Sequence, residues 1–451
     1  MGTRNRSRES GSRAAPDIGR RRGAMSLQML VLLVPVMFGM MGFAIDLGRL
    51  YLIRGELTQA AQTMAIAAAS KLNGTEQGLA DATAASQATL DDSTGHGSKY
   101  NFGSLLIGQS TGMLNSLVSD PIYFATAAGA IGADTSSSDT GGADGTTAKY
   151  VRINLTADAP LVFWGLLTLG QSRITPIAAT AVAGVSAPLC TACGIEPYAI
   201  AALSADDTVD FGFSTGVVYT FGFQCTGGIA PAALPGATQR IPYLIVDRYN
   251  DASSLDETQQ LYRIGAQGLL PAAPGGGVST ATPSTTFACM MATGTEIAWA
   301  SAQPPACGSP TVPTQVPASV TNAACGLFNR FDTAVFAGCE ARITDIDTIS
   351  TAYQPDTDLT EIADYTTYVG NSRRIITVPV VDTLSPGGPM TILGFRQFLL
   401  NPNQGDVNIT PTDQDARFNA LYIGNVRPLK QGSMSGGCAL TSGPGKVVLH
   451  K

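Results

Sequence analysis

An uninterrupted apolar segment near the N-terminus dominates the hydrophobic pattern of this 451-residue chain. Residues 24–45 read AMSLQMLVLLVPVMFGMMGFAI and contain no charged side chain. At about 1.5 Å per residue, a helix of that length measures about 30 Å, which is the thickness of the hydrocarbon core of a bilayer. The pattern therefore predicts a transmembrane helix over residues 24–47.

The helical pattern continues beyond this segment in an amphipathic form. Apolar and small residues recur at intervals of three and four, which is typical of one buried helix face. Asn73-Gly74 is a typical helix stop. We expect one rod of about 70 Å whose second part, residues 48–73, extends outside the membrane. The recurring residues are Leu50, Ile53, Leu57, Ala60, Ala61, Met64, Ala67 and Ala68.

The remainder of the chain shows strand patterns separated by long polar stretches. Residues 74–149 are rich in Ser, Gly and Ala and predict a loop segment, and residues 150–186 predict a short β-rich block. The sequence at 208–223 predicts a hairpin, and residues 264–329 predict irregular loops because they lack periodicity. Four further apolar runs predict strands, at 241–249, 373–381, 390–400 and 419–429.

Charge is distributed unevenly between the N-terminus and the rest of the chain. Residues 1–23 form a basic leader with seven of the 27 basic residues and two of the 34 acidic residues, so the remainder has a net charge of −12. Arg20–Arg22 directly precede the apolar segment, which predicts a cytoplasmic N-terminus and an exported body. An acidic body argues against nucleic acid as a partner.

The apolar segment is longer than that of a cleavable signal peptide, and no small-x-small cleavage site follows it. We therefore expect a single-pass protein of the inner (cell) membrane, in contact with membrane lipid, with most of the chain periplasmic or otherwise extracytoplasmic.

All eight cysteines lie in the region 187–451 that is predicted to be exported. An even number of cysteines in an oxidising compartment favours disulfides, although the sequence leaves their connectivity open. The Cys190-x-x-Cys193 pair also allows a redox site or half of a zinc site, but no βαβ pattern surrounds it and no second such pair follows. We expect disulfides, with no metal site and no cofactor. The candidates are Cys190, Cys193, Cys225, Cys289, Cys307, Cys325, Cys339 and Cys438.

Histidine is scarce, with only His96 and His450 in the chain. This scarcity disfavours catalysis that needs a histidine as general acid or base. We therefore expect no catalytic residues, no enzyme activity and no small-molecule substrate.

Two blocks of the sequence resemble a known family. The first block has a basic pair and Gly-Ala at 21–24, the apolar segment, AIDLGRLY at 44–51 and an alanine-rich tail. The second has VRINL at 151–155, PLVFW at 160–164, ITP at 174–176 and AATAVAG at 178–184. Both are similar to the N-terminal region of TadE/TadG-like proteins of the tight-adherence (Flp) pilus system. The resemblance implies a non-enzymatic, membrane-anchored component of Flp/Tad-type pilus assembly or secretion. Its partners would be other pilin-like or Tad assembly proteins.

The resemblance also implies a candidate processing site. Pilin-like members of that system are cleaved after a glycine that precedes the apolar segment, and they carry glutamate at the fifth position of the mature chain. Gly23 and Ala24 occupy the cleavage junction, but Gln28 stands at the fifth position. The missing carboxylate favours an assembly factor over a shaft subunit.

Two alternatives remain open, a minor pseudopilin and a membrane-anchored adhesin or von Willebrand A-like binding module. The predicted fold class is α+β, with one long transmembrane, pilin-like helix followed by a β-rich, loop-rich exported region that contains disulfides.

Overall fold

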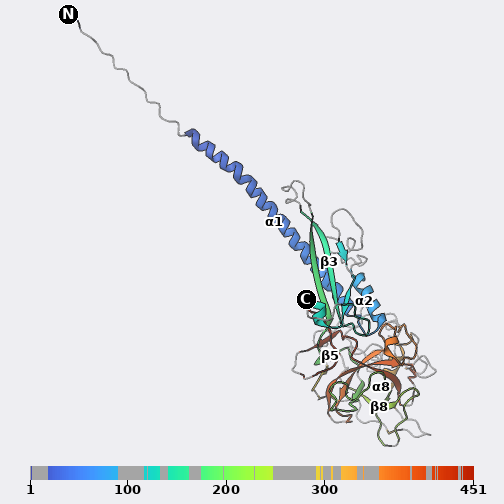
Figure 1. Cartoon of the computed structure of the whole chain (residues 1–451). Helices are drawn as coiled ribbons and strands as arrows, with labels where there is room; N and C mark the ends of the chain where they lie inside the picture. Colours follow the sequence, from blue (N-terminus) through green and yellow to red (C-terminus); the bar gives the residue numbers. More distant parts are fainter. Residues whose placement is uncertain are drawn as a thin grey trace.

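A long helix, a small sheet and a β-barrel make up the described part of the chain in a computed structural model (Figure 1). Of residues 19–25 the structure describes only the backbone. The basic leader lies, except for residues 2 and 19–23, outside the described residues. The structure describes residues 2, 19–89, 116–118, 120–132, 141–161, 174–196, 198–227, 229–246, 291–294, 296–297, 306–307, 316–332, 339, 355–385, 389–402, 409–411, 413, 415–434, 438 and 440–451.

The N-terminal helix α1 (Gly19–Ala69) is continuous over 51 residues, with Pro35 inside it. This confirms the prediction that the apolar segment and the amphipathic extension form one rod. Figure 1 shows that its first part stands clear of the other elements, while its second part lies against them. After the helix the chain turns at Gly74, whose φ of 80° is in the left-handed region that favours glycine.

The first sheet covers the second part of α1. Strands β3 (Tyr150–Pro160) and β4 (Ile174–Val185) form an antiparallel pair over eleven residue pairs, which confirms the strands predicted within 150–186. Strands β1 (Ser116–Val118) and β2 (Ile122–Phe124) pair with β3. The last strand of the chain, β15 (Val447–Leu449), pairs with β4, so the C-terminus returns to the N-terminal module.

The prediction of a loop over 74–149 is wrong where short helices form. Helix α2 (Glu76–Ala88) begins after Thr75, whose hydroxyl accepts a hydrogen bond from the Gly78 N–H. Helix α4 (Ala127–Ile131) has the same kind of cap. The hydrophobic pattern of the sequence does not predict α2, because the buried face of this helix consists of small side chains. These are Gly78, Ala82 and Ser86.

The second module is a closed barrel of six strands. In spatial order these are β12 (Met390–Asn401), β11 (Ile375–Val381), β6 (Tyr198–Ala201), β8 (Gln239–Ile245), β7 (Val218–Phe223) and β13 (Phe418–Gly424). Strand β13 pairs again with β12, which closes the ring, and the pairs β6–β11 and β7–β8 are parallel. All four strands predicted from the apolar runs are present, as β8, β11, β12 and β13.

Two minor strand pairings flank the barrel. The short strand β10 (Glu296–Ile297) adds to β12. A separate small sheet contains β14 (Gln431–Ser433), β5 (Thr191–Cys193) and β9 (Met291–Ala292).

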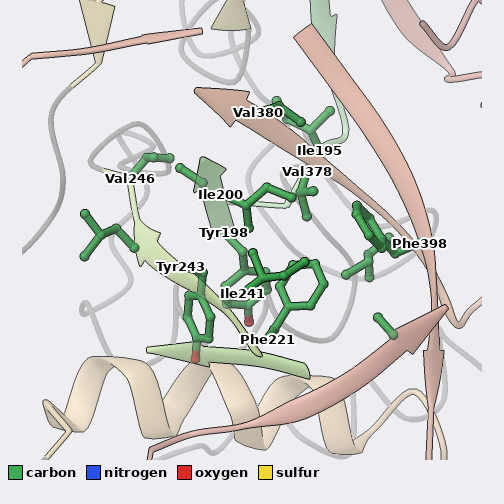
Figure 2. Packing of buried hydrophobic residues seen from close by; sticks show 14 of the residues in the cluster. Ile195, Tyr198, Ile200, Phe221, Ile241, Tyr243, Val246, Val378, Val380 and Phe398 are labelled. Carbon is green, nitrogen blue, oxygen red and sulfur yellow. The ribbon is translucent and has the colours of Figure 1, made fainter. Parts of the chain in front are cut away.

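Aromatic rings fill the barrel (Figure 2). The Phe221 ring meets the Phe398 ring edge-on at 5.1 Å between centroids, and the Tyr198 ring meets the Tyr243 ring in the same way at 5.3 Å. Both geometries are favourable for aromatic pairs. Helix α8 (Ala318–Phe328) adds Val320, Ala323 and Leu327 to this core.

Helix α8 corrects the prediction that all of 264–329 is irregular. Nearly every residue from Val320 to Phe328 is buried, so no exposed polar face alternates with an apolar one and the sequence shows no helical periodicity. Packing against the barrel stabilises this helix more than its own sequence does.

The hairpin predicted over 208–223 is half wrong, because only its second arm forms a strand, β7. The first arm is a series of turns around Asp207, whose carboxylate accepts hydrogen bonds from the N–H groups of Val209, Asp210 and Gly212. Such side-chain bonds compete with the ladder of a sheet. They hold Phe211 at a φ of 55° with its ring buried in the barrel core.

The Asp207 turn generates a pH-dependent prediction. The three N–H donors lower the pKa of Asp207 below its ordinary value, so its contribution to stability is present above about pH 4 and is lost as the pH falls through the lowered pKa. We expect Asp207→Ala to lower the melting temperature of the detergent-solubilised chain at pH 7, and this deficit to shrink below about pH 4. The neighbouring exposed residue provides the control, since Asp206→Ala should change little at either pH. A deficit that stays constant down to pH 3, or an equal deficit for Asp206→Ala, would contradict this account.

Candidate functional site

The first part of α1 presents an apolar surface that nothing in the described structure covers. Between residues 27 and 47 the large apolar side chains are 39–72% exposed. An apolar surface of this extent is unfavourable in water and marks a membrane or protein contact. Within the described residues, α1 is the one helix long and apolar enough to cross a membrane. By length and composition it fits a membrane anchor or a signal sequence.

The second part of α1 is buried along the stripe that the sequence predicts. Ile53, Leu57, Ala61, Met64 and Ala68 are each at most 1% exposed. Their spacing of three and four residues places them on one helix face. The helix therefore changes its environment along its length while remaining one continuous element.

The sheet meets this stripe with a layer of small side chains. From β4 the contact residues are Ala179, Ala181 and Ala183, and opposite them β3 contributes Val151 and Ile153. Alternate residues of a strand point to the same face, so the three alanines form one smooth surface. Methyl groups on this strand let the helix approach the sheet closely, and the larger side chains come from the helix and from β3.

The candidate processing residues lie within the same helix. Gly23 and Ala24 are both part of α1, which begins four residues before Gly23. Gln28 follows on the first turns of the exposed apolar part. The junction between residues 23 and 24 is therefore helical in this structure.

Six of the eight candidate cysteines form three disulfides. The pairs are Cys190–Cys438, Cys225–Cys307 and Cys325–Cys339. Cys190 thus bonds to a residue 248 positions away and not to Cys193 of the C-x-x-C pair, which removes the redox interpretation of that pair. Cys289 lies outside the described residues, and of Cys193 only the backbone is described, in β5. No described cysteine has a free thiol.

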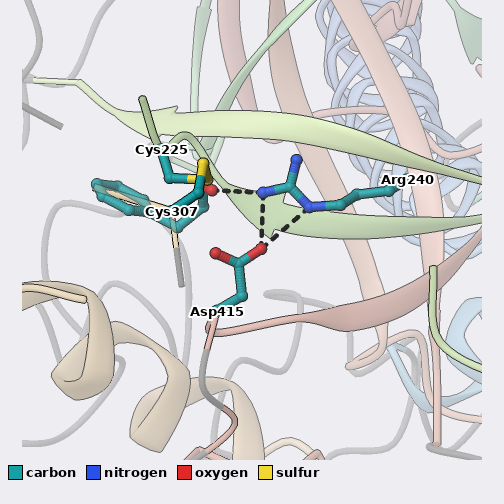
Figure 3. The surroundings of a disulfide bond; sticks show 5 residues. Cys225, Arg240, Cys307 and Asp415 are labelled. Carbon is teal, nitrogen blue, oxygen red and sulfur yellow. Dashed lines mark hydrogen bonds and ion pairs between the residues drawn. A yellow bond between two sulfur atoms is a disulfide. The ribbon is translucent and has the colours of Figure 1, made fainter. Parts of the chain in front are cut away.

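The Cys225–Cys307 disulfide lies beside a buried ion pair (Figure 3). The Nη2 atom of Arg240 is 2.6 Å from Asp415 Oδ2 and donates a second bond to the carbonyl of Phe223. Burial raises the pKa of Asp415, and Arg240 opposes this shift. A Cβ on Gly222 would approach Arg240 Nε to 2.3 Å, so the close packing here requires glycine. These contacts cross-link strands of the barrel and give the ion pair a structural role.

A second buried polar network joins the barrel to the end of α1. Arg374 is completely buried and donates hydrogen bonds to the carbonyls of Leu400, Asp358 and Thr360. These bonds hold the segment before β11, whose Tyr365 hydroxyl donates to the Asn73 carbonyl at 2.6 Å. The turn after α1 and the segment before β11 are therefore in direct contact.

The structure places one of the two histidines and allows a search of the described residues for metal-binding groups. No group of three His, Cys, Asp or Glu side chains there has the arrangement to hold a metal ion. His450 packs edge-on against Tyr150 on the first sheet, with 5.2 Å between ring centroids. His96 lies outside the described residues.

Comparison of the chain with protein-family models, with curated proteins and with solved structures finds no match.

The alanine layer generates a packing prediction with a matched control on the same strand. Ala181 is fully buried under α1, whereas Ala178 points to the exposed face of β4. Ala181→Leu is expected to lower the free energy of unfolding by about 1–3 kcal/mol, because the helix must move away from the sheet. Ala178→Leu should stay within about 0.5 kcal/mol of the wild type. Denaturant unfolding of the full chain in detergent measures both, and equal effects of the two substitutions would show that the alanine layer is not a close contact.

The disulfide pairing generates a second prediction. Proteolytic digestion without reductant should yield three linked peptide pairs, which join Cys190 to Cys438, Cys225 to Cys307 and Cys325 to Cys339, as identified by mass spectrometry. Removing one native disulfide by paired Cys→Ser substitution typically costs about 2–5 kcal/mol. A Cys190–Cys193 link as the main product would refute this pairing and restore the redox interpretation.

Proposed function

We propose that this chain is a single-pass membrane protein with a non-enzymatic role in assembling or anchoring a Flp/Tad-type pilus. In this proposal α1 spans the inner (cell) membrane. The sheet and the barrel lie outside the cytoplasm, and they present a rigid surface to other pilin-like or Tad assembly proteins.

The observation that carries the proposal is the division of α1 into two environments. A core helix of a soluble protein would be buried along most of its length, but only 11% of the most apolar window of α1 is buried. A signal sequence would be dispensable for the fold, but the second part of α1 supplies one wall of the core under β3 and β4. A lipid-embedded first part and a folded second part satisfy both facts.

Charge and disulfides support the proposed orientation. Arg20–Arg22 stand at the N-terminal side of the apolar segment, and basic residues favour the cytoplasmic side. Three disulfides in the opposite part of the chain suit an oxidising, exported environment.

The pilus role rests on the sequence resemblance together with the geometry of the helix. Within the apolar part of α1, the space around Gly39 is open, with no other atom within 4 Å of where a Cβ would stand. Small residues of this kind let a second helix approach closely within a membrane. A neighbouring pilin-like helix is the partner that this surface fits.

Two alternatives are less well supported. A von Willebrand A-like module would alternate strands and helices beyond residue 186, whereas the described residues there form a barrel with one α-helix, α8. A minor pseudopilin would be cleaved between Gly23 and Ala24, but that junction lies inside a helix and the glutamate of pilins is replaced by Gln28. Peptidases cut extended segments more readily than helices.

The proposal predicts three linked results in the organism of origin. Deleting the gene should abolish surface pili, and the wild-type gene should restore them. The chain should remain in the membrane fraction after pili are sheared off, with its arginine leader intact on N-terminal sequencing. A phosphatase fused after Lys451 should be active, because that enzyme folds only when exported.

Each alternative has its own outcome. A chain that begins at Ala24 and co-purifies with sheared pili identifies a minor pseudopilin. Normal pili in the deletion strain, with loss of surface attachment alone, identify an adhesin. An inactive phosphatase fusion overturns the membrane orientation and, with it, the whole proposal.

A further inference from the structure

A polar pocket opens at the end of the barrel that faces the helix module. Its volume is about 170 Å³, several times the roughly 30 Å³ that one water molecule occupies in the liquid. The walls come from three chain segments that are distant in sequence. These are the stretch before β6 (Gly194, Glu196), the stretch leading into β11 (Asn371–Thr377) and the stretch after β13 (Arg427–Lys430). Arg330 and Gln397 complete the lining.

The charge of this lining is opposite to that of the protein. Four lining residues are basic, Arg330, Arg373, Arg427 and Lys430, whereas Glu196 is the one carboxylate among the described lining residues. Glu196 is already engaged, because its Oε1 atom accepts a hydrogen bond from Arg330. The chain as a whole carries a net charge of −7, so a concentration of positive charge in a concave site is not a consequence of composition.

Two of the cations form no ion pair within the described part of the chain, although the Asp356 carboxylate lies near enough to Arg427 to raise the pKa of that group. Among the ion pairs of the described residues, neither Arg427 nor Lys430 takes part. Burial lowers the pKa of both groups, and repulsion between the basic residues adds to the effect, from Arg330 on Arg427 and from Arg427 on Lys430. The pocket therefore holds like charges close together.

The site is held in place by backbone and amide contacts. The Arg427 guanidinium donates to the Ser372 carbonyl at 2.9 Å, and the Arg427 N–H donates to Gln397 Oε1 at 2.9 Å. The Gln397 side chain in turn donates to the Arg427 carbonyl. The amide of Gln397 therefore holds both backbone groups of Arg427, the first residue of the stretch 427–430. A preorganised arginine with unused donors is well suited to bind an oxyanion through charge-assisted hydrogen bonds.

We propose that this pocket binds a small multivalent oxyanion, the class that includes phosphate esters and polycarboxylates. Such a ligand would pair with Arg427 and Lys430 and would cancel their mutual repulsion. A second positive group, Lys71 at the end of α1, adds to the potential at Lys430, so the ligand would also stabilise the join between helix and barrel.

The headgroups of the surrounding bilayer are excluded as the ligand if α1 is the anchor proposed above. Lys71 follows the end of the membrane segment by 24 residues, which places the pocket about 35 Å from the membrane surface. This distance is several times the Debye length of about 8 Å. The exclusion of lipid depends on the proposed membrane anchoring, but the binding proposal itself does not.

Isothermal titration of the detergent-solubilised full chain tests the site, in a phosphate-free buffer at pH 7. Sodium phosphate, glycerol 3-phosphate and citrate are titrated separately, with sodium chloride at matched ionic strength as the control. We expect a dissociation constant below about 1 mM for at least one of the three and no binding of chloride. If phosphate and glycerol 3-phosphate bind and citrate does not, the pocket is a phosphate site. If citrate binds and the two phosphate compounds do not, the pocket is a polycarboxylate site.

Variants decide whether binding occurs at this pocket. Lys430→Gln and Arg427→Gln should each weaken binding by about tenfold or more, since each removes a hydrogen bond to a charged group. Lys149→Gln is the matched control, because Lys149 is also exposed but directly precedes β3 of the first sheet. Lys430 is exposed and makes no hydrogen bond in the described structure, so its variant should keep the wild-type melting temperature even if Arg427→Gln does not fold.

Two results would overturn the proposal. One is the absence of binding by all three anions below 1 mM. The other is unchanged affinity of Lys430→Gln for an anion that the wild type binds. If an acidic peptide binds at Lys430 while the three small anions do not, the pocket is a protein-docking site and the small-ligand proposal is wrong.

Discussion

The close contact between α1 and the alanine face of β4 is the interaction on which the rest of the structure depends. The body of the protein is attached to its apolar helix through this layer, in which Ala179, Ala181 and Ala183 meet the buried stripe of the helix. Because the second part of α1 is part of a core, its direction relative to the sheet is set by packing. The exposed first part continues in the same direction, since no break interrupts the helix. A load on the body would therefore be transmitted to the apolar segment through a packed interface and not through a flexible linker.

The path of the chain makes the barrel an insertion into the helix module. Strand β4 ends at Val185, the barrel and the small sheet follow, and β15 then returns to pair with β4. The Cys190–Cys438 disulfide joins the start of this insertion to its end. Besides the β4–β15 pairing, the hydrogen bond between Tyr365 and Asn73 is a second contact between the two modules. Together these contacts restrain the barrel at several points relative to the helix module.

The charged side chains of the barrel module fall into two groups. Arg374 and the Arg240–Asp415 pair have their polar atoms largely occupied by carbonyls, amides or each other, and such satisfied groups specify one arrangement of the surrounding segments. Arg427 and Lys430 differ, because they stand in a concave surface and form no ion pair among the described residues. The contrast separates charges that hold the fold together from charges that remain available to a ligand.

The local pattern of the sequence was sufficient to predict each helix or strand whose buried residues recur with a single regular spacing. The 51-residue helix, its buried stripe and the strands β3, β4, β8, β11, β12 and β13 follow from apolar runs, alternation and spacing along a single segment. Helix α2 was missed because its buried face is made of small residues, and helix α8 because it is buried almost all round and shows no periodicity. The first arm of the hairpin is not a strand because the Asp207 carboxylate accepts hydrogen bonds from the backbone N–H groups there. The closure of the barrel, the return of β15, the Cys190–Cys438 pairing and the basic pocket each join residues that are tens to hundreds of positions apart. Only the tertiary structure decided these features, because a sequence pattern reports which face of an element is buried and carries no information about which distant segment will cover it.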